Sequence, residues 1–363
     1  MERSLPYFGP GPAALPASVL EEAANAVREY AGSGLSILEI PHRGALFVSI
    51  LEEANYLVKR LCSLGNDYEV LWLTGGGRQQ FAMVAQNLLV GNPNARAAYV
   101  DSGYWASEAI AVGKVLGNVD VVASTRETGY RSVPDLSHLS LQEQTAYLHL
   151  TTNNTIWGTA QNGPPPTVNV PVVADMSSDI LGVPHRYTDY DLFYAVAQKN
   201  LGPAGVTLVC IKKTLLAQMN TLLPPIYSYR AHVAAGGVLN TLPVFPIFVC
   251  LLMLRWTAEK GLDFLQEENR QKSKMLYAAL EKSLCFNLPV LPASRSVMNC
   301  IWTAQSKEME TAFLHFAEAR GLLGIAGHRA AGAFRASLYN GVSKNAVALL
   351  VKAVEDFSKT FHS

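Results

Sequence analysis

The chain has 363 residues, of which 49% are hydrophobic and only 16% are charged, below the ~25% usual for soluble chains. Its 29 basic residues balance 29 acidic ones, and a formal net charge of zero argues against a broad electrostatic footprint for nucleic acid or an anionic membrane. This length and apolar content exclude intrinsic disorder, predict one large α/β domain with a smaller partner, and favour a buried subunit interface.

The start of the chain has no apolar run of the signal-peptide type. The longest apolar stretch, 242–254, contains two prolines and is shorter than the ~20 residues of a membrane span, so it predicts a buried helix. The five cysteines have no ligand-like spacing, and four of them stand among apolar neighbours. We therefore predict a soluble, cytoplasmic protein with reduced core cysteines and no metal site.

Along the chain, an irregular arm rich in proline and glycine comes first. Apolar residues at helical spacing then predict helices at 19–27 and 46–61. Seven short apolar runs follow and predict strands at 69–73, 97–100, 119–123, 147–150, 170–174, 192–196 and 206–211. Near-continuous apolar runs of this kind favour a mostly parallel sheet that is covered by helices on both faces.

The pattern changes after about residue 258. Amphipathic helices are predicted at 262–280, 308–320 and 343–361, and an alternating strand is predicted at 297–303. These elements favour an α+β domain. We predict a large domain at 14–258 and a small domain at 259–363, with the N-terminal arm 1–13 packing near the small domain.

A glycine turn at 74–77 follows the first predicted strand and leads through Arg78 into a helical pattern at 80–89. Unpaired N–H groups at the start of a helix, together with the helix dipole, bind phosphate. A tight strand-to-helix connection is the plain structural alternative, and the turn by itself does not separate the two.

The same turn matches part of a dinucleotide-binding motif. Gly75 and Gly77 occupy the first two glycine positions, and Asp101 ends a later strand at about the right distance. The third position is Gln80, where close packing needs a small residue. A nicotinamide-dependent oxidoreductase is therefore the weaker alternative.

Asp175 and Lys199 each follow a predicted strand, at 170–174 and 192–196. Either residue alone has an ordinary explanation, because the carboxylate could cap a helix and the lysine could lie exposed in a loop. A buried lysine, however, has a lowered pKa and becomes a nucleophile that can form a Schiff base. If the two strands are neighbours, the acid and the amine converge as pyridoxal phosphate requires, since its ring nitrogen pairs with a carboxylate.

Basic residues form a second pattern. His-Arg pairs occur at His42-Arg43 and His328-Arg329, and Arg335 follows the second pair by six residues. For any one of them a surface ion pair is an ordinary explanation, but the set contains more cationic donors than a substrate with one carboxylate needs. Because guanidinium groups bind phosphate and carboxylate alike, the set predicts a doubly anionic substrate that carries both groups.

These residues, in this order, resemble the phosphoserine aminotransferase family, in the class V branch of the fold-type I pyridoxal-phosphate enzymes. The resemblance covers nearly the whole chain and is carried by GPAALP at 11–16, the segment 32–43, GGGR at 75–78, ADMSS at 174–178, AQKN at 197–200, NT at 240–241, GHR at 327–329 and RAS at 335–337. It implies a fold-type I transferase, with a large domain built on a mostly parallel seven-stranded sheet and a smaller α+β C-terminal domain.

The resemblance also implies roles for single residues. Lys199 would form the Schiff base with pyridoxal 5'-phosphate and act as general acid and base, and Asp175 would pair with the pyridinium nitrogen. Further cofactor contacts would come from Trp105 by stacking, from Thr155, from Gly77, Arg78 and Gln198 at the phosphate, and from Asn240 and Thr241 of the partner subunit. The substrate would be bound at its α-carboxylate by Arg335 and at its other anionic group by His42, Arg43, His328 and Arg329.

The activity implied by the resemblance is transfer of an amino group between L-glutamate and 3-phosphohydroxypyruvate, which gives O-phospho-L-serine and 2-oxoglutarate in L-serine biosynthesis. The implied assembly is a homodimer with active sites at the subunit interface. Some relatives also use 4-phosphohydroxythreonine, a vitamin B6 precursor, and the sequence does not separate the two uses.

Three positions depart from the usual family pattern, because Asn154 replaces a glutamate, Pro41 replaces a serine, and Leu242 replaces a proline. None of them has a direct catalytic role. The remaining alternatives are a desulfurase, which needs an accessible cysteine of low pKa, an aminotransferase for another small oxo acid, and a catalytically inactive relative used as a binding module.

Overall fold

The computed structural model describes residues 5–328, 331 and 334–360. Its centre is a seven-stranded sheet in the order β1-β9-β8-β7-β4-β2-β3. The strands are β1 (Tyr68–Thr74), β2 (Arg96–Asp101), β3 (Asn118–Ser124), β4 (Thr145–Thr151), β7 (Val172–Asp175), β8 (Leu192–Val196) and β9 (Val206–Lys212). All seven predicted strands are confirmed, and every end lies within two residues of its predicted position.

Strand direction follows the prediction with one exception. Strand β9 runs antiparallel to both of its neighbours, β1 and β8. The other pairs of this sheet are parallel. The predicted α/β fold with a mostly parallel sheet is therefore confirmed.

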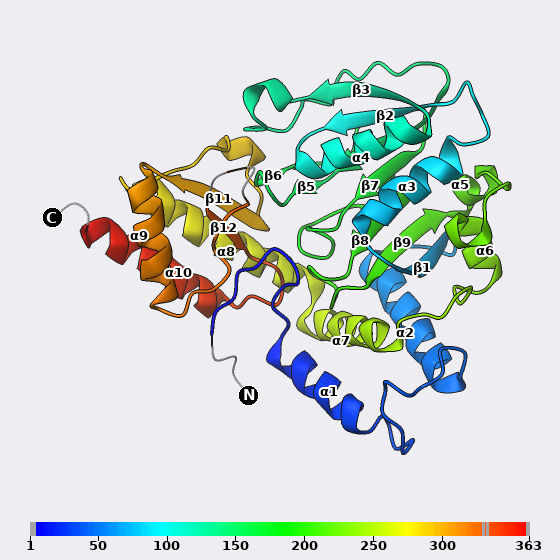
Figure 1. The fold of residues 1–363 in the computed structure, drawn as a ribbon, viewed down its shortest axis with the longest axis horizontal. Helices are drawn as coiled ribbons and strands as arrows, with labels where there is room; N and C mark the ends of the chain where they lie inside the picture. The colour runs from blue at the N-terminus through cyan, green and yellow to red at the C-terminus, as the bar shows by residue number, and fades with distance from the viewer. Residues whose placement is uncertain (1–4, 329–330, 332–333, 361–363) are drawn as a thin grey trace.

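Helices cover both faces of the sheet (Figure 1). On one face lie α1 (Ala17–Arg28), α2 (Ala45–Leu61) and α7 (Val244–Lys260); on the other lie α3 (Gly77–Leu88), α4 (Tyr104–Leu116), α5 (Lys213–Gln218) and α6 (Tyr229–Ala234). The neighbouring residues Leu71 and Trp72 of β1 belong to different buried clusters, because successive side chains of a strand point to opposite faces.

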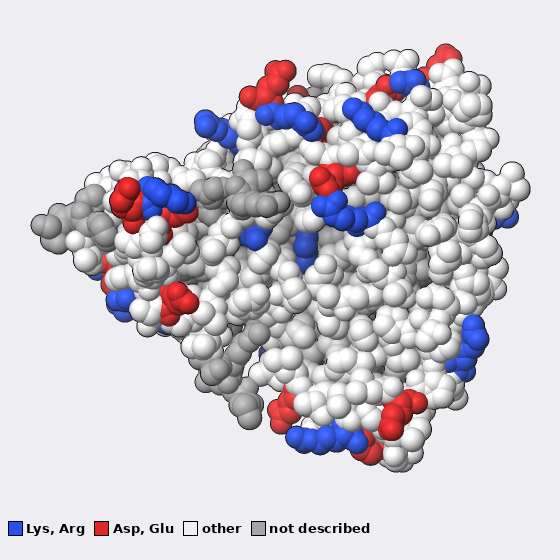
Figure 2. Space-filling view, in the orientation of Figure 1, with Lys and Arg blue, Asp and Glu red and all other residues white. Residues whose placement is uncertain are grey.

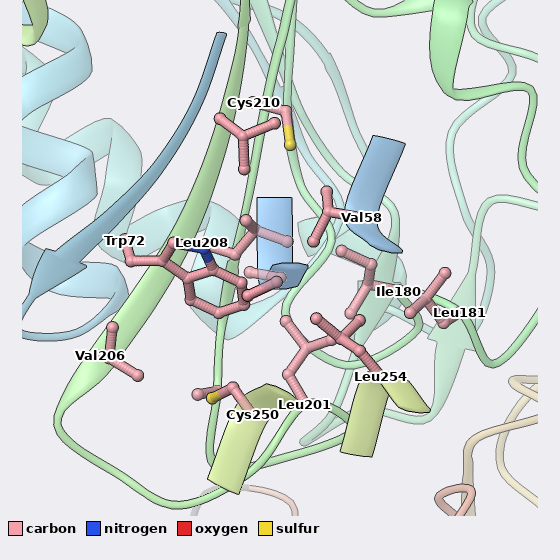
Figure 3. Packing of buried hydrophobic residues seen from close by; sticks show 14 of the residues in the cluster. Val58, Trp72, Ile180, Leu181, Leu201, Val206, Leu208, Cys210, Cys250 and Leu254 are labelled. Carbon is pink, nitrogen blue, oxygen red and sulfur yellow. The ribbon is translucent and has the colours of Figure 1, made fainter. Parts of the chain in front are cut away.

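Helix α7 confirms the predicted buried helix. It is apolar on all sides and is buried from Ile247 to Leu254, as expected for a helix that lies inside a core. Figure 3 shows Cys250 of this helix on the side of Trp72 of the sheet, and Leu254 of the same helix next to Leu201. Within the described residues, no helix has the length and apolarity that crossing a membrane requires.

The C-terminal part is built around a small antiparallel sheet, β10-β11-β12. Its elements are α8 (Leu262–Lys282), β10 (Phe286–Asn287), β11 (Asn299–Ala304), α9 (Lys307–Glu318), β12 (Phe334–Ser337) and α10 (Lys344–Thr360). Packed rings of Phe286, Phe313 and Phe334 lie at the centre of its own hydrophobic cluster.

The N-terminal arm packs against this C-terminal cluster. Phe8 is fully buried in it, and the Phe8 amide donates to Leu323 O at 2.8 Å. The division of the chain at residue 258 stays a prediction: α7 runs through this position to Lys260, and α8 begins at Leu262.

Candidate active site

Asp175 and Lys199 converge because their strands are neighbours. Strands β7 and β8 pair in parallel, with Asp175 opposite Tyr194. Lys199 lies three residues beyond the end of β8, in a turn that the Gly202 amide closes on Ala197 O at 2.7 Å. The charge of each group influences the pKa of the other. The carboxyl ends of two parallel strands thus bring an acid and an amine to one edge of the sheet.

Asp175 ends β7 and is 6% exposed. Burial raises the pKa of its carboxyl group, while the Lys199 ammonium and a hydrogen bond from the Ser177 amide (2.9 Å to Oδ1) act in the opposite direction. A buried carboxylate in this position is suited to a cationic partner such as a protonated ring nitrogen.

Burial brings the pKa of the Lys199 amine toward physiological pH. Part of the side chain remains accessible, but surrounding atoms desolvate the amine and lower its pKa to about 8, against the opposing effect of Asp175. Lys199 Nζ donates to Thr155 Oγ1 at 3.0 Å. The amine is therefore both held in place and able to act as a nucleophile.

Arg335 adds a cation to the same site. It lies in β12 opposite Ile301, is 6% exposed, and donates from Nη1 to Thr155 O at 3.4 Å. Its Nε is buried without a hydrogen-bond partner, and burial lowers the pKa of the guanidinium. No acidic side chain in the described part of the chain forms an ion pair with it. A buried, unpaired guanidinium next to a nucleophilic lysine is suited to an anionic group of a ligand.

Three of the predicted site residues, Trp105, His328 and Arg78, lie together at the start of α4. Trp105 is the second residue of α4, next to Tyr104, and the His328 ring lies 5.5 Å from the Tyr104 ring. The guanidinium of Arg78 lies 5.4 Å from the Trp105 ring centre and pairs with Glu108 of α4. Phosphate binding by the Arg78 side chain stays a prediction. Arg329 lies outside the described residues.

The glycine turn has the geometry of an anion site at a helix start. Gly75 has φ +116° and donates its amide to Gly205 O at 3.0 Å, and Gly77 is the first residue of α3. The Gln198 carbonyl accepts from the Ala13 amide of the N-terminal arm at 2.9 Å, so the arm crosses beside Lys199. Asn240 donates to Thr74 Oγ1 at 3.3 Å, next to the turn and within the same chain.

His42, Arg43 and Thr241 form a separate group. His42 and Thr241 share a shallow pocket, and Arg43 donates to Val238 O at 3.3 Å. His42 Nε2 is buried without a partner. Among the described residues, no hydrogen bond or ion pair connects this group to Lys199 or Arg335.

The dinucleotide alternative finds no support in this geometry. Asp101 is buried and its carboxylate accepts hydrogen bonds from Ser107, Ser124 and Tyr130, so it is occupied within the fold. Gln80 is buried and accepts from Tyr229 at 2.7 Å. Both residues therefore have structural explanations.

Two further polar residues beside the site, Tyr339 and Asp179, were not predicted from the sequence. The phenol of Tyr339 donates to Pro10 O of the arm at 3.1 Å and accepts from Asn299. Asp179 is buried four residues after Asp175. The only signal in the sequence was their spacing from Arg335 and Asp175.

The face of the molecule drawn in Figure 2 is largely uncharged, and a few basic atoms lie in its middle, between the large sheet and the C-terminal part. This agrees with a site built from a small number of buried cations rather than from a broad basic surface.

Comparison with known proteins gives the following similarities. Residues 7–350 match the model of the class-V aminotransferases. The chain is 40% identical to a phosphoserine aminotransferase of Bacillus cereus over 96% of this chain and 97% of that protein, and 41% identical to one of Desulfosudis oleivorans over 99% of both. Among solved structures, the phosphoserine aminotransferase of Bacillus circulans subsp. alkalophilus matches with a TM-score of 0.96 at 38% identity, over 99% of this chain and 100% of that one. The pyridoxal-phosphate-bound phosphoserine aminotransferase of Trichomonas vaginalis matches with a TM-score of 0.91 at 30% identity, over 97% and 99%.

Proposed function

This chain belongs to the class-V aminotransferase family, and we propose that it is a pyridoxal-phosphate-dependent phosphoserine aminotransferase. The reaction transfers an amino group between L-glutamate and 3-phosphohydroxypyruvate and yields O-phospho-L-serine and 2-oxoglutarate, a step of L-serine biosynthesis. The observation that carries the proposal is the desolvated Lys199 amine beside the buried Asp175 carboxylate and the unpaired Arg335 guanidinium.

The residues present fit pyridoxal phosphate group by group. An aldehyde needs an amine of lowered pKa, a protonated ring nitrogen needs a buried carboxylate, and a phosphate needs N–H groups at a helix start. Lys199, Asp175 and the turn before α3 offer these three features. When bound, this cofactor supplies an electron sink for cleavage of the bond between the substrate α-carbon and its hydrogen.

The residues of the chain then bind, orient and move protons. Lys199 would hold the cofactor aldehyde, and its Nζ would carry a proton from and to the α-carbon of the substrate. Thr155, 3.0 Å from Nζ, orients this amine. Asp175 would keep the ring nitrogen of the cofactor protonated. Because both amino acids react at one site, the two half-reactions alternate.

Substrate recognition requires cationic contacts to two anionic groups of the substrate. Arg335 is suited to the α-carboxylate that both substrates share, because it lies within 3.4 Å of the residue that orients Lys199. His42, Arg43, His328 and Arg329 are proposed to bind the phosphate of one substrate and the side-chain carboxylate of the other.

We further propose a cytoplasmic homodimer in which His42, Arg43, Asn240 and Thr241 serve the site of the partner subunit. The support is an apolar surface around His42-Arg43, where Leu38 is 61% exposed, and the absence of contacts, within the described residues, between this pair and Lys199. A second copy would cover these exposed leucines and close the site. The five free cysteines are all buried, in keeping with a reducing compartment.

The test is a coupled assay with glutamate and 3-phosphohydroxypyruvate, recorded beside the visible spectrum of the purified protein. Wild type should show activity and a visible band that borohydride abolishes. Lys199→Ala should lose both, whereas Lys213→Ala, which alters an exposed lysine at the start of α5, should keep both. Activity at the wild-type rate in Lys199→Ala would exclude the proposal.

Competition between phosphoserine and alanine as amino donors tests the alternative, an aminotransferase for another oxo acid. Phosphoserine should be strongly preferred, because an unphosphorylated donor leaves the residues proposed to bind the phosphate without an anionic partner. A desulfurase is not supported, because all five cysteines are buried.

A further inference from the structure

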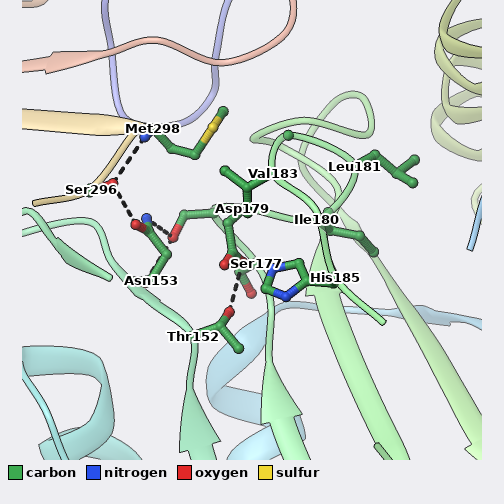
Figure 4. A network of polar contacts seen from close by, with 12 residues as sticks. Thr152, Asn153, Ser177, Asp179, Ile180, Leu181, Val183, His185, Ser296 and Met298 are labelled. Carbon is green, nitrogen blue, oxygen red and sulfur yellow. Dashed lines mark hydrogen bonds and ion pairs between the residues drawn. The ribbon is translucent and has the colours of Figure 1, made fainter. Parts of the chain in front are cut away.

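Asp179 is a second buried carboxylate behind the active site, and nothing proposed above uses it. It lies in the turn that follows β7 and is 2% exposed. A carboxylate buried to this degree requires hydrogen-bonding or cationic partners. Figure 4 shows Asp179 between Thr152, which follows β4, and His185.

Thr152 connects Asp179 to Asp175. The amide of Thr152 donates to the Asp175 carbonyl at 3.1 Å, and its hydroxyl lies 2.8 Å from Asp179 Oδ1 and 3.1 Å from the same carbonyl. A hydroxyl has one hydrogen to donate, and the charged acceptor at the shorter distance takes it. A change at Asp179 therefore reaches the backbone of Asp175 through a single residue.

His185 holds the other oxygen of Asp179. Its Nε2 lies 3.0 Å from Asp179 Oδ2, and its side chain is 5% exposed. The His185 ring packs against Tyr187 and Tyr190, with ring centres 5.6 and 6.4 Å apart. An imidazole N–H at this position donates whether or not the ring is charged, so the contact closes the turn between 179 and 185 in either state.

The charge of Asp179 acts on the catalytic groups. It raises the pKa of the Lys199 amine and so opposes the effect of burial, and it also raises the pKa of the Asp175 carboxyl. The same charge raises the pKa of Tyr187 and Tyr190. In the described part of the chain, the titratable groups that Asp179 affects or contacts are thus Lys199, Asp175, both tyrosines and His185. Asp179 thus places a negative potential behind both groups that would contact the cofactor.

We propose that Asp179 is a positioning residue of this site, which holds the Asp175 backbone through Thr152 and keeps a fixed negative charge behind Lys199, with His185 locking its side chain. The inference rests on the proposed function, since it takes Lys199 and Asp175 as the groups that contact the cofactor.

The experiment measures the titration of Lys199 directly, in the full-length apoprotein. Each variant is labelled with a trace of acetic anhydride across pH 6–11, and peptide mass spectrometry follows Lys199 with the exposed Lys213 as internal reference. Asp179→Asn keeps the shape and an acceptor for Thr152 but removes the charge, and Asp179→Thr is a second variant that removes it. Asp120→Asn is the matched control, because Asp120 pairs with Arg96 at the far edge of the sheet.

The labelling midpoint of Lys199 should fall by roughly half a pH unit or more in both Asp179 variants and stay unchanged in Asp120→Asn. His185→Gln keeps the carboxylate charged and should leave the midpoint at or above the wild-type value. Equal midpoints in wild type and the Asp179 variants would overturn the proposal, as would a fall in His185→Gln to the Asp179→Asn value, because packing rather than charge would then move the midpoint.

Adding pyridoxal phosphate to the same samples separates this inference from the proposed function. Absence of a borohydride-sensitive band in wild type would contradict the function itself. A normal band in wild type together with unshifted Asp179 variants would contradict only the role of Asp179.

Discussion

Lys272 offers a quantitative test of how this fold treats a buried charge. It lies in the middle of α8 with no exposed surface, and its Nζ donates to Tyr339 O at 3.0 Å and Val342 O at 2.8 Å. Burial lowers the pKa of this amine to about 7, with Glu268 acting in the opposite direction. We predict that Lys272→Met, which removes the amine but keeps most of the volume, stabilises the protein at low pH and destabilises it at high pH.

The magnitude follows from the two titrations. The amine has a pKa of 10.5 in the unfolded chain and about 7 in the folded protein, so between these values the unfolded chain binds a proton that the folded chain has released. Stability therefore rises with pH through this window and is constant below it. The difference, 10.5 − 7 = 3.5 units, corresponds to ~5 kcal/mol at 1.36 kcal/mol per unit.

Methionine removes this dependence but also removes two hydrogen bonds. Tyr339 O keeps the Val342 amide as a donor at 2.9 Å, whereas Val342 O loses its partner on α8. These losses together amount to ~3 kcal/mol. The variant should thus be ~2 kcal/mol more stable than wild type near pH 6 and ~2–3 kcal/mol less stable near pH 10.5.

Urea unfolding at several pH values between 6 and 10.5 measures this effect. The difference between variant and wild type cancels the other titrating groups, Lys199 among them. Lys274→Met, at an exposed position of the same helix, is the control and should follow the wild-type curve. Curves for wild type and Lys272→Met that run parallel across the window would refute the argument from burial.

Three further results are expected. Arg335→Lys should raise the KM of both substrates more than tenfold in steady-state kinetics, because lysine lacks the fork that binds a carboxylate at two points. Cofactor loading, measured by the visible band, should stay unchanged, and a change confined to loading would contradict the assigned role. Asp175→Asn should still bind the cofactor but react with glutamate ~10²–10⁴-fold more slowly in a single-turnover experiment, and a rate equal to that of Asp120→Asn would contradict the assigned role. In the native state the five cysteines should not react with Ellman's reagent and all five should react in urea, because each is buried; rapid labelling of one thiol in the native protein would contradict this burial.

The sheet and the convergence of Asp175 with Lys199 could be predicted because they depend on local patterns. Strands in the middle of the large sheet, such as β8 and β9, are buried on both faces, so their sequences are continuous apolar runs with visible ends. Polar residues that directly follow such runs lie at the edge of a parallel sheet. The reversed direction of β9 has no such signal, since an apolar run does not indicate whether a strand pairs in a parallel or an antiparallel way.

The polar contacts that complete the site could not be predicted, because they join residues that no period relates. Thr152 and Asp179 meet across two strands, and Lys272 meets carbonyl groups from a turn about 70 residues further along the chain. Lysine and aspartate are usually exposed in proteins, and only the tertiary structure shows that Lys272 and Asp179 are buried. The Arg78 side chain likewise pairs with Glu108, and the sequence of the glycine turn does not predict this contact.

The segment after β12 explains why the site depends on both parts of the chain. Arg335 lies in β12, and Tyr339 follows four residues later with its carbonyl held by Lys272 and its phenol bound to Pro10 O of the arm. The arm in turn donates from Ala13 to the carbonyl of Gln198, directly before Lys199. Arg335 and Lys199, the proposed substrate-binding and catalytic residues, are thus fixed to each other through the N-terminal arm as well as through Thr155. Loosening the arm should therefore weaken binding of the α-carboxylate without touching either side chain.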